Sequence, residues 1–216
     1  MVRDKNKIPL FPLNIVLLPE TPLPLHIFEE RYKEMINDCL KSDSEFGIVY
    51  ASDSNIQSSG CTAYIERVIH TYDDGRLDIQ IRGKKRFRIL EISKERSFLQ
   101  AIVEFFDDET DDSHEDLQTL AVRGLALIKK LQEMTHRDEL LKDMEQMNFK
   151  TLSFYFAAAY GFTGEEKQQF LELTSTFERL QKTVNGLQHV VKRLRMLKII
   201  EKASLESKKK YGFSNN

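Results

Sequence analysis

The sequence predicts an α+β protein with a β-rich first half and a helical second half. All five prolines fall within the first 24 residues, and β-branched residues collect in the stretch that follows, around Gly47, Gly60, Gly75 and Gly83. Beyond Gly83 proline is absent, and apolar residues recur at helical spacing. Because proline removes an N–H group and clashes with the preceding helical turn, the opening segment must be extended or turning. This separation of strand signals from helix signals favours an α+β order over a βαβ alternation.

The first strands surround a single predicted helix. We expect a strand at 14–18 and an edge strand at 22–25, because the prolines of the second segment restrict it to the rim of a sheet. From Phe28 onward the apolar period becomes helical. The expected core face of this helix consists of Phe28, Tyr32, Met35, Ile36, Cys39 and Leu40. An apolar run at 46–50 predicts a short buried strand, followed by a polar loop at 51–59.

A long hairpin follows, with arms at 61–71 and 76–92. The Asp-Gly pair that ends at Gly75 supplies the positive φ angles that a tight turn requires. Along the second arm apolar and polar residues alternate, which is typical of a half-buried strand. Gly83 interrupts this alternation and predicts a bulge or bend of the kind that barrels need at their corners. A last strand is expected at 98–106.

Helices dominate the second half. The acidic run at 107–116 contains no basic residue, and we interpret it as a solvated connector. A helix is expected from Leu117 onward, and a short, very apolar helix at 151–160. Thr163 and Ser175 each stand three residues before a glutamate, the spacing of a capping box, and so predict two further helix starts. The last helix carries an apolar stripe formed by Phe177, Leu180, Val184, Leu187, Val191 and Leu194.

The composition excludes several classes of protein. The 216 residues include 32 lysines and arginines against 34 aspartates and glutamates, so no bulk charge attracts nucleic acid or an anionic membrane. Two cysteines are too few for a disulfide framework or a zinc module. No apolar leader follows Met1, and no later stretch reaches the ~18 apolar residues of a membrane span. We therefore expect a cytoplasmic protein in a reducing compartment, without membrane association.

A proline-rich opening and several short motifs carry a family resemblance. The opening reads Ile-Pro-Leu-Phe-Pro-Leu at 8–13 and continues to Pro-Leu-His-Ile-Phe-Glu-Glu-Arg-Tyr at 24–32, and shorter matches lie at 46–49, 60–63 and 83–89. These segments resemble the N-terminal substrate-binding domain of Lon-type ATP-dependent proteases. Within them we expect structural roles for Pro12, Pro19, His26, Phe28, Glu29, Arg31, Tyr32, Gly83, Arg86 and Phe87.

The resemblance implies both a fold and a function. It implies a PUA-like β-barrel, which we expect at 1–106, followed by a helical bundle at 107–216 that ends in a long helix. In that family the long helix leads into an ATPase module and then a Ser-Lys peptidase domain, whereas this sequence ends at Asn216. We therefore expect a stand-alone, non-enzymatic module that captures unfolded or tagged polypeptides, or that docks on a protease as an adaptor.

The residues themselves predict no catalytic site. Neither a Gly-x-x-x-x-Gly-Lys-Ser/Thr loop nor a Gly-x-Ser-x-Gly elbow occurs in the sequence. Both cysteines lie in apolar patterns, and the five histidines never occur in pairs at metal-ligand spacing. We interpret His26, the histidine within a family motif, as a packed or hydrogen-bonded residue rather than a ligand contact. We accordingly expect no catalytic residue, no metal and no cofactor.

A second hypothesis is RNA binding through the barrel. PUA-like barrels elsewhere bind RNA, and the end of the last helix is also rich in lysine and arginine. The cations expected to project from one strand region are Arg82, Lys84, Lys85, Arg86 and Arg88. The alternative is an ordinary solvated strand face. Because exposed aromatic residues for base stacking do not flank these cations in the sequence, polypeptide binding is the favoured hypothesis.

Aromatic residues concentrate on the short apolar helix and just after it. The candidates for a groove that receives apolar client segments are Phe154, Tyr155, Phe156, Tyr160 and Phe162. A short helix cannot bury every side of itself, so some of this surface must meet another element or a partner. Core packing between barrel and bundle is the alternative, and we weigh it more heavily.

The end of the last helix offers a second candidate surface. Past Val191 the apolar residues no longer keep one narrow stripe, and lysines and arginines surround them. Leu194, Leu197 and Ile200 are therefore candidates for docking a partner or a second copy of the chain. The alternative is that they fold back onto the bundle.

Overall fold

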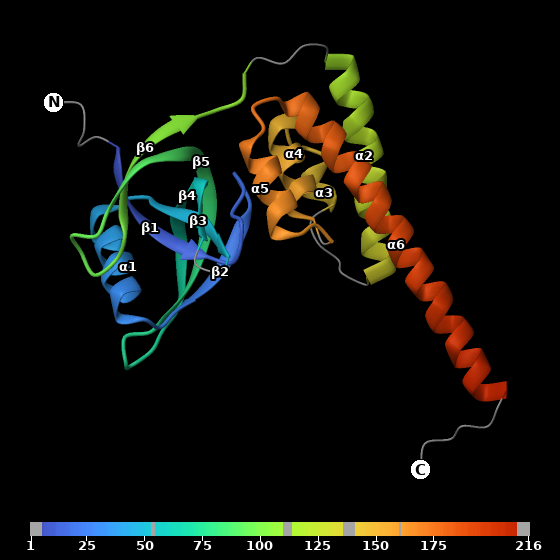
Figure 1. The fold of residues 1–216 in the computed structure, drawn as a ribbon, viewed down its shortest axis with the longest axis horizontal. Coiled ribbons are helices and arrows are strands. Elements are labelled where there is room, and N and C mark those ends of the chain that lie inside the picture. Colours follow the sequence, from blue (N-terminus) through green and yellow to red (C-terminus); the bar gives the residue numbers. More distant parts are fainter. Residues whose placement is uncertain (1–5, 53–54, 110–113, 136–140, 160, 211–216) are drawn as a thin grey trace.

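The computed structural model describes residues 6–52, 55–109, 114–135, 141–159 and 161–210. A barrel formed by the first part of the chain lies beside a helical half formed by the rest (Figure 1). The α+β order that the sequence predicts, strands first and helices after, is confirmed.

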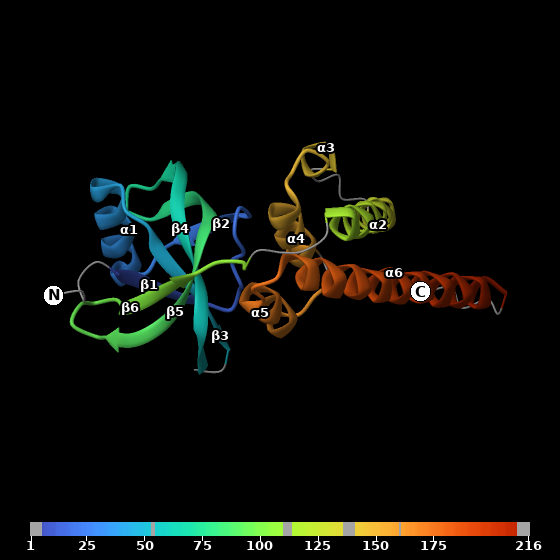
Figure 2. The same ribbon diagram turned by 90° about the horizontal axis from the view of Figure 1, so that it is seen from above.

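Strands make up most of the first half, and helices the second. The first half contains, in chain order, β1 (Lys7–Leu13), β2 (Pro22–Ile27), α1 (Glu30–Ser42), β3 (Phe46–Ser52), β4 (Asn55–Thr71), β5 (Leu77–Ser93) and β6 (Gln100–Phe106). The second half contains α2 (His114–Thr135), α3 (Leu141–Met144), α4 (Phe149–Ala158), α5 (Gly164–Glu172) and α6 (Thr176–Lys210). Helix α6 extends outward from the junction with the barrel (Figure 2).

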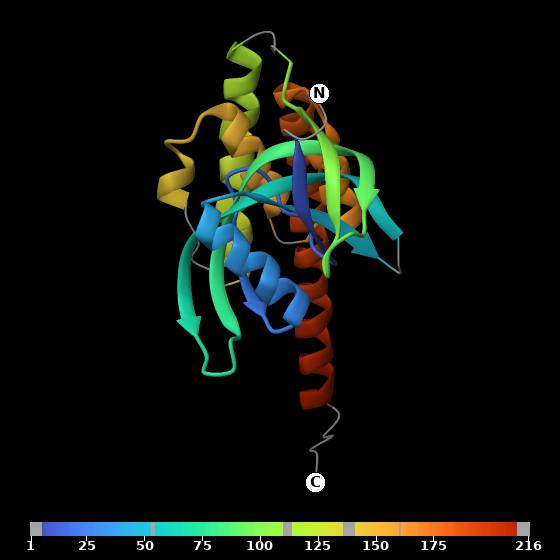
Figure 3. The ribbon, with the colours of Figure 1, turned by 90° about the vertical axis from the view of Figure 1, so that its left-hand side faces the viewer.

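The strands form one sheet in the order β2-β5-β4-β3-β1-β6, and a further pairing of β5 with β6 closes it into a barrel. β1 and β3 run parallel, whereas the other pairs are antiparallel. The first part of β5 pairs with β2 and its second part with β6, so this strand serves two neighbours in turn. Helix α1 packs across the barrel, and its buried residues belong to the barrel core (Figure 3).

Gly83 lies where β5 changes partner. The register between β4 and β5 shifts opposite this point, between Cys61 and Ala63. A Cβ atom at Gly83 would lie 2.2 Å from the carbonyl oxygen of Leu18, so a residue with a side chain would clash with the backbone there. The bend that the sequence predicts at Gly83 is therefore confirmed, and its cause is the close approach of two backbone segments.

The predicted strand at 14–18 is wrong. β1 ends before it, and these residues form an irregular segment instead. Its apolar side chains still reach the core, since those at 16–18 are at most 9% exposed. Turn hydrogen bonds replace a sheet ladder: the Thr21 hydroxyl donates to the Leu18 carbonyl at 2.7 Å, and the Gly83 N–H donates to the Thr21 carbonyl at 3.1 Å. The apolar run therefore indicated burial rather than strand pairing.

Helix α1 buries most of the core face predicted for it. The buried members are Tyr32, Met35, Ile36 and Cys39. The expectation is wrong for Phe28 and Leu40, which are 59% and 41% exposed. The helix begins at Glu30 with Glu29 as its N-cap residue, so Phe28 precedes the first turn, and Leu40 lies off the buried stripe.

The helical half has its own core between α2, α4 and α6. The predicted stripe of α6 lies in it: Leu180, Val184 and Leu187 are fully buried, and Val191 is 5% exposed. None of the helices in the described part of the chain combines the length and apolar character needed to span a membrane.

Both predicted capping signals start helices. At α5 the Thr163 side chain accepts the Glu166 N–H while the Glu166 carboxylate accepts the Thr163 N–H, which completes a capping box. Before α6 the Ser175 hydroxyl accepts the Glu178 N–H at 3.0 Å. These two starts position α5 and the first turn of α6 against the barrel.

Candidate functional site

The barrel and the helical half meet at a buried ion cluster. Arg86 of β5 and Arg179 of α6 approach the same carboxylate, that of Asp108, which follows β6. The side chains of Arg86, Arg179 and Asp108 are 1%, 0% and 7% exposed. Arg179 donates to both oxygens of this carboxylate, with 3.1 Å from Nη1 to Oδ1, and Arg86 donates through Nη2. The cluster therefore links a barrel strand to the first turn of α6.

Backbone and hydroxyl oxygens accept further hydrogen bonds from the two guanidinium groups. Arg86 Nη1 donates to the Leu171 carbonyl at 2.9 Å, and Arg179 Nε donates to the Ser153 hydroxyl at 2.7 Å. The Phe154 ring lies against both cations, with its centroid 3.8 Å from Arg179 Cζ and 5.2 Å from Arg86 Cζ. Buried charges are tolerated when they are paired and hydrogen-bonded in this way, and such a network favours a single arrangement of the junction.

Both kinds of charge in the cluster are maintained. Burial acts to raise the pKa of Asp108, but the hydrogen bonds and positive charge of Arg179 outweigh it and hold that pKa below its ordinary value. Burial lowers the pKa of Arg86, against the attraction of Asp108. An arginine nonetheless stays protonated at physiological pH. Two cations therefore share one buried carboxylate.

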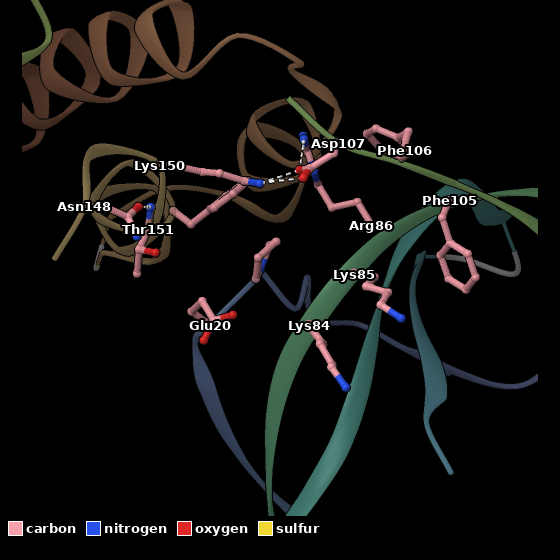
Figure 4. A pocket seen from close by; sticks show the side chains of 12 residues that line it. Glu20, Lys84, Lys85, Arg86, Phe105, Phe106, Asp107, Asn148, Lys150 and Thr151 are labelled. Atoms are coloured by element: carbon pink, nitrogen blue, oxygen red, sulfur yellow. Dashed lines mark hydrogen bonds and ion pairs between the residues drawn. The ribbon is translucent and has the colours of Figure 1, made fainter. Parts of the chain in front are cut away.

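A groove of about 530 Å³ opens beside this cluster, between the barrel and α4 (Figure 4). Its barrel wall carries Lys84 and Lys85 from β5 and Phe105 and Phe106 from the end of β6. Its helical wall carries Lys150 from α4. Arg86 of the ion cluster and the Phe154 ring that packs on it also line the groove, so the junction forms part of its surface.

The groove combines aromatic rings with positive charge. Lys150 reaches Asp107 at 2.6 Å, and Lys84 pairs with Glu45 at 2.7 Å. The hydrogen bond to Glu45 raises the pKa of Lys84. Lys85 is exposed and has no carboxylate within ion-pair distance among the residues that the structure describes. This arrangement suits the binding of a chain with apolar and acidic side chains, and it contains no nucleophile beside a base.

The strand cations do not form a uniform basic surface. The expectation that all of them project is wrong for Arg86, which the cluster buries. Arg82 pairs with Glu66 at 2.5 Å, and Arg88 Cζ lies 4.4 Å from the centroid of the Phe106 ring. The expectation of a solvated acidic connector is likewise wrong for Asp108, because two arginines enclose it. The described strand therefore offers few cations for phosphate contacts.

Two of the aromatic residues predicted to bind clients lie in the interior. Phe154 and Phe156 are 1% and 0% exposed. Phe154 packs against the arginines of the ion cluster, and Phe156 lies in the core of the helical half. Packing between the two halves, the alternative weighed more heavily, accounts for Phe154. Phe154 also lines the groove.

The other predicted aromatic residues are separated from one another. Tyr155 is half-buried, and its hydroxyl donates to the Glu20 carbonyl at 3.1 Å. Phe162 packs edge to face on Phe170 with ring centroids 5.0 Å apart. Tyr160 lies outside the described residues. The structure therefore does not gather the described members of the predicted set on one open surface.

The family-motif residues make contacts within the barrel. Phe87 is fully buried in a small core between β-strands. Arg31 pairs with Glu29 at 2.7 Å, and His26 Nδ1 lies 2.6 Å from the Asp78 carboxylate. The hydrogen-bonded geometry expected of His26 is therefore present. Buried or half-buried positions are also occupied by Pro12, Pro19 and Tyr32.

The far end of α6 is exposed in this chain. Leu194 packs against the helical core, whereas Leu197 and Ile200 are 50% and 60% exposed. Met196 and Ile199 beside them are 56% and 63% exposed. Figure 1 shows α6 continuing alone past the end of α2. Two of the three predicted docking residues thus face solvent.

Metal and thiol chemistry have no support from the described residues. Within that part of the chain no group of three or more His, Cys, Asp or Glu side chains lies close enough to hold a metal ion. Cys39 and Cys61 are both buried and free. Burial raises the pKa of Cys61 to about 12, which keeps its sulfur protonated and unreactive at neutral pH.

Several residues of the site were missed from the sequence. They are Phe105, Phe106, Asp108, Lys150 and Arg179. Thr176, Arg179 and Thr183 recur at helical spacing beside the apolar stripe of α6, and they are 6%, 0% and 0% exposed. Because a polar stripe on a helix is ordinarily its solvated face, this spacing did not distinguish Arg179 from a surface arginine.

Comparisons with known proteins identify relatives of this domain. A family model described as the ATP-dependent protease La (LON) substrate-binding domain matches residues 7–189. The Lon protease of Flavobacterium johnsoniae is 24% identical over 204 residues, which cover 88% of this chain and 25% of that protein. The Lon protease of Cytophaga hutchinsonii is 26% identical over 187 residues, which cover 80% and 23%. The chain spans about a quarter of the length of these curated relatives.

Solved structures share the fold. A crystal structure of a Lon N-terminal domain protein from Xanthomonas campestris is similar with a TM-score of 0.64 at 23% identity, covering 83% of this chain and 97% of that one. The N-terminal domain of a Mycobacterium avium complex Lon protease is similar with a TM-score of 0.67 at 18% identity, covering 84% and 98%.

Proposed function

This chain belongs to the family of ATP-dependent Lon protease substrate-binding domains, and from that premise we propose that it is a non-enzymatic module that captures unfolded or tagged polypeptides, or carries them to a protease as an adaptor. We assign the capture role to the groove between the barrel and α4. The observation that carries this assignment is the meeting of aromatic rings and lysine amines from separate parts of the chain in one groove.

The size of the groove favours an extended chain over a folded one. About 530 Å³ lies within the range of sites that enclose a small ligand. A few side chains of an extended segment fill such a volume, whereas the smooth surface of a folded protein does not enter it. The groove would therefore bind polypeptides that expose an extended segment and would not bind the surface of a folded protein.

The ion cluster supports binding by holding the groove in one shape. Arg86 and Phe154 line the groove, and both are fixed by contacts with Arg179 or Asp108. A preorganised site loses less conformational entropy when its ligand binds, so more of the contact energy appears as affinity. This supports a binding role for the junction beyond its contribution to folding.

Titration with one client protein in folded and unfolded forms tests the proposal. We expect the unfolded form to bind and the folded form not to. The variant Phe105→Ala removes a ring that is 38% exposed in the groove, and it should weaken binding about five-fold or more. Phe28→Ala is the matched control, since Phe28 is 59% exposed and does not line the groove. Equal binding of both client forms, or binding of neither, contradicts the proposal.

A further inference from the structure

The ion cluster beside the groove carries more positive than negative charge, and its member Arg86 lines the groove. Arg86 and Arg179 share the single carboxylate of Asp108. Asp107 lies 3.6 Å from Arg86, but it is also engaged by Lys150 at 2.6 Å. The cluster therefore has a positive charge that its carboxylate does not fully balance, and the low exposure of Arg86 and Arg179 limits the screening of that charge by solvent.

The barrel wall adds Lys85, a further cation beside an aromatic ring. Lys85 has no ion-pair partner among the described residues, and its amine lies 5.5 Å from the centroid of the Phe105 ring. The Phe106 ring lies 4.7 Å from Arg86 Cζ in the same wall. Glu20 also lines the groove without an ion pair to the described residues, and Figure 4 shows it apart from Lys85 and Phe105.

Asp107, one of the carboxylates that line the groove, is already paired with a lysine across it. The Asp107 side chain is 68% exposed, and Lys150, its partner across the groove, is 42% exposed (Figure 4). Exposed ion pairs contribute little to stability because water solvates both charges well. An incoming carboxylate can therefore take the place of Asp107 on Lys150 at small cost.

We propose that this groove selects polypeptide segments in which aspartate or glutamate side chains stand next to apolar residues. Carboxylates of the segment pair with Lys85 and Lys150, and the adjacent apolar side chains pack on Phe105 and Phe106. The two lysines come from opposite walls, which favours several carboxylates spaced along a segment over a single terminal carboxylate. This inference rests on the proposed function, because it specifies the substrate class of the same groove.

Two labelled peptides that differ only in charge test the inference. Both are extended and amidated at the C-terminus and contain alternating phenylalanine; one carries aspartate and the other asparagine. At ~0.05 M salt the aspartate peptide should bind about five-fold or more tightly than its asparagine counterpart, and the difference should shrink at ~0.5 M salt as the charges are screened. Fluorescence anisotropy measures both affinities.

Charge reversal on the protein locates the effect. Lys85→Glu should abolish the preference for the aspartate peptide and favour a lysine peptide instead. Lys94→Glu is the matched control, since Lys94 is an exposed lysine outside the groove, and it should leave the preference unchanged. Thermal melting of both variants verifies that each remains folded.

The outcomes separate this inference from the proposed function. Equal binding of the aspartate and asparagine peptides overturns the acidic preference while capture of unfolded chains stands. Failure to bind either peptide or the unfolded client overturns both. A single-stranded RNA that binds more tightly than the aspartate peptide and depends on Lys85 in the same way also overturns the inference, as does a preference that appears only when the C-terminus is left free.

Discussion

The Asp108 carboxylate accepts hydrogen bonds from two nitrogens of Arg179, and the two side chains are 7% and 0% exposed. The residues lie far apart in the sequence, one directly after the last barrel strand and the other in the first turn of α6. Arg86 completes the contact from within the barrel. This one carboxylate therefore holds the barrel, the connector and the long helix together.

Asp108→Asn should destabilise the protein strongly. The change removes the negative charge that two buried guanidinium groups share, and leaving such charges uncompensated costs about 3–5 kcal/mol. Urea unfolding followed by circular dichroism measures the loss. Asp107→Asn is the control, because Asp107 is 68% exposed and its replacement should change stability little. Equal effects of the two variants would show that the cluster does not stabilise the junction.

The stability of the protein should fall in acid partly because of Asp108. Its pKa in the folded state lies below the ordinary value of 3.8, so the unfolded state binds more protons in acid, and the free energy of unfolding rises with pH in that range. This contribution is complete above the ordinary pKa and is lost as pH falls through the folded value. Asp108→Asn should show a shallower pH dependence from about pH 5 to about pH 2. Parallel curves for the variant and the wild type would contradict this.

Gly83→Ala should destabilise the barrel. The added Cβ would lie 2.2 Å from the Leu18 carbonyl oxygen and 2.9 Å from its carbon, and this carbonyl is held in place by the N–H and the hydroxyl of Thr21, which both donate to it. Overpacking of this kind costs about 1–3 kcal/mol. Gly75→Asn is the control: Gly75 has φ of +80°, a Cβ there would come no closer than 3.9 Å to the Lys33 side chain, and asparagine tolerates a left-handed backbone. Thermal melting should rank Gly83→Ala well below both the wild type and the control.

The exposed end of α6 should mediate self-association or docking of a protease partner. The double variant Leu197→Glu, Ile200→Glu places charge on residues that are 50% and 60% exposed, so it should reduce the assembled mass in sedimentation without lowering the melting temperature. Leu187→Ala is the contrast: Leu187 is buried, so its truncation should lower the free energy of unfolding by about 2–5 kcal/mol. A collapse of the melting temperature in the double variant, with unchanged mass, would place these residues in the core of the single chain.

Local physics made much of the fold predictable. Proline and glycine restrict the backbone wherever they occur, so the division into halves and the bend at Gly83 followed from the sequence. The helix starts at Thr163 and Ser175 were predictable for the same reason, because their capping hydrogen bonds join residues only three positions apart. Local rules did not distinguish burial from strand pairing at 14–18, because an apolar segment can reach the core without joining a ladder.

The site was harder to predict because its contacts are distant in sequence. Arg86 lies in an alternating strand where the cations two residues away on either side, Lys84 and Arg88, are exposed, and nothing near it in the sequence indicates that α6 will cover it. Asp108 lies in an acidic run whose charge suggests solvent. Burial of Arg86 or Asp108 is favourable only when both residues and Arg179 are in contact. Tertiary contacts among these three residues therefore determine their burial, and the local sequence pattern does not.

Helix α6 also separates the two candidate surfaces of the chain in space. Arg179 fixes its root in the junction, and at about 1.5 Å per residue Ile200 lies about 30 Å further along the axis. The helix packs against its own bundle as far as Leu194, and the exposed residues Leu197 and Ile200 lie beyond that point. A partner held on Leu197 and Ile200 would therefore leave the groove open to a client.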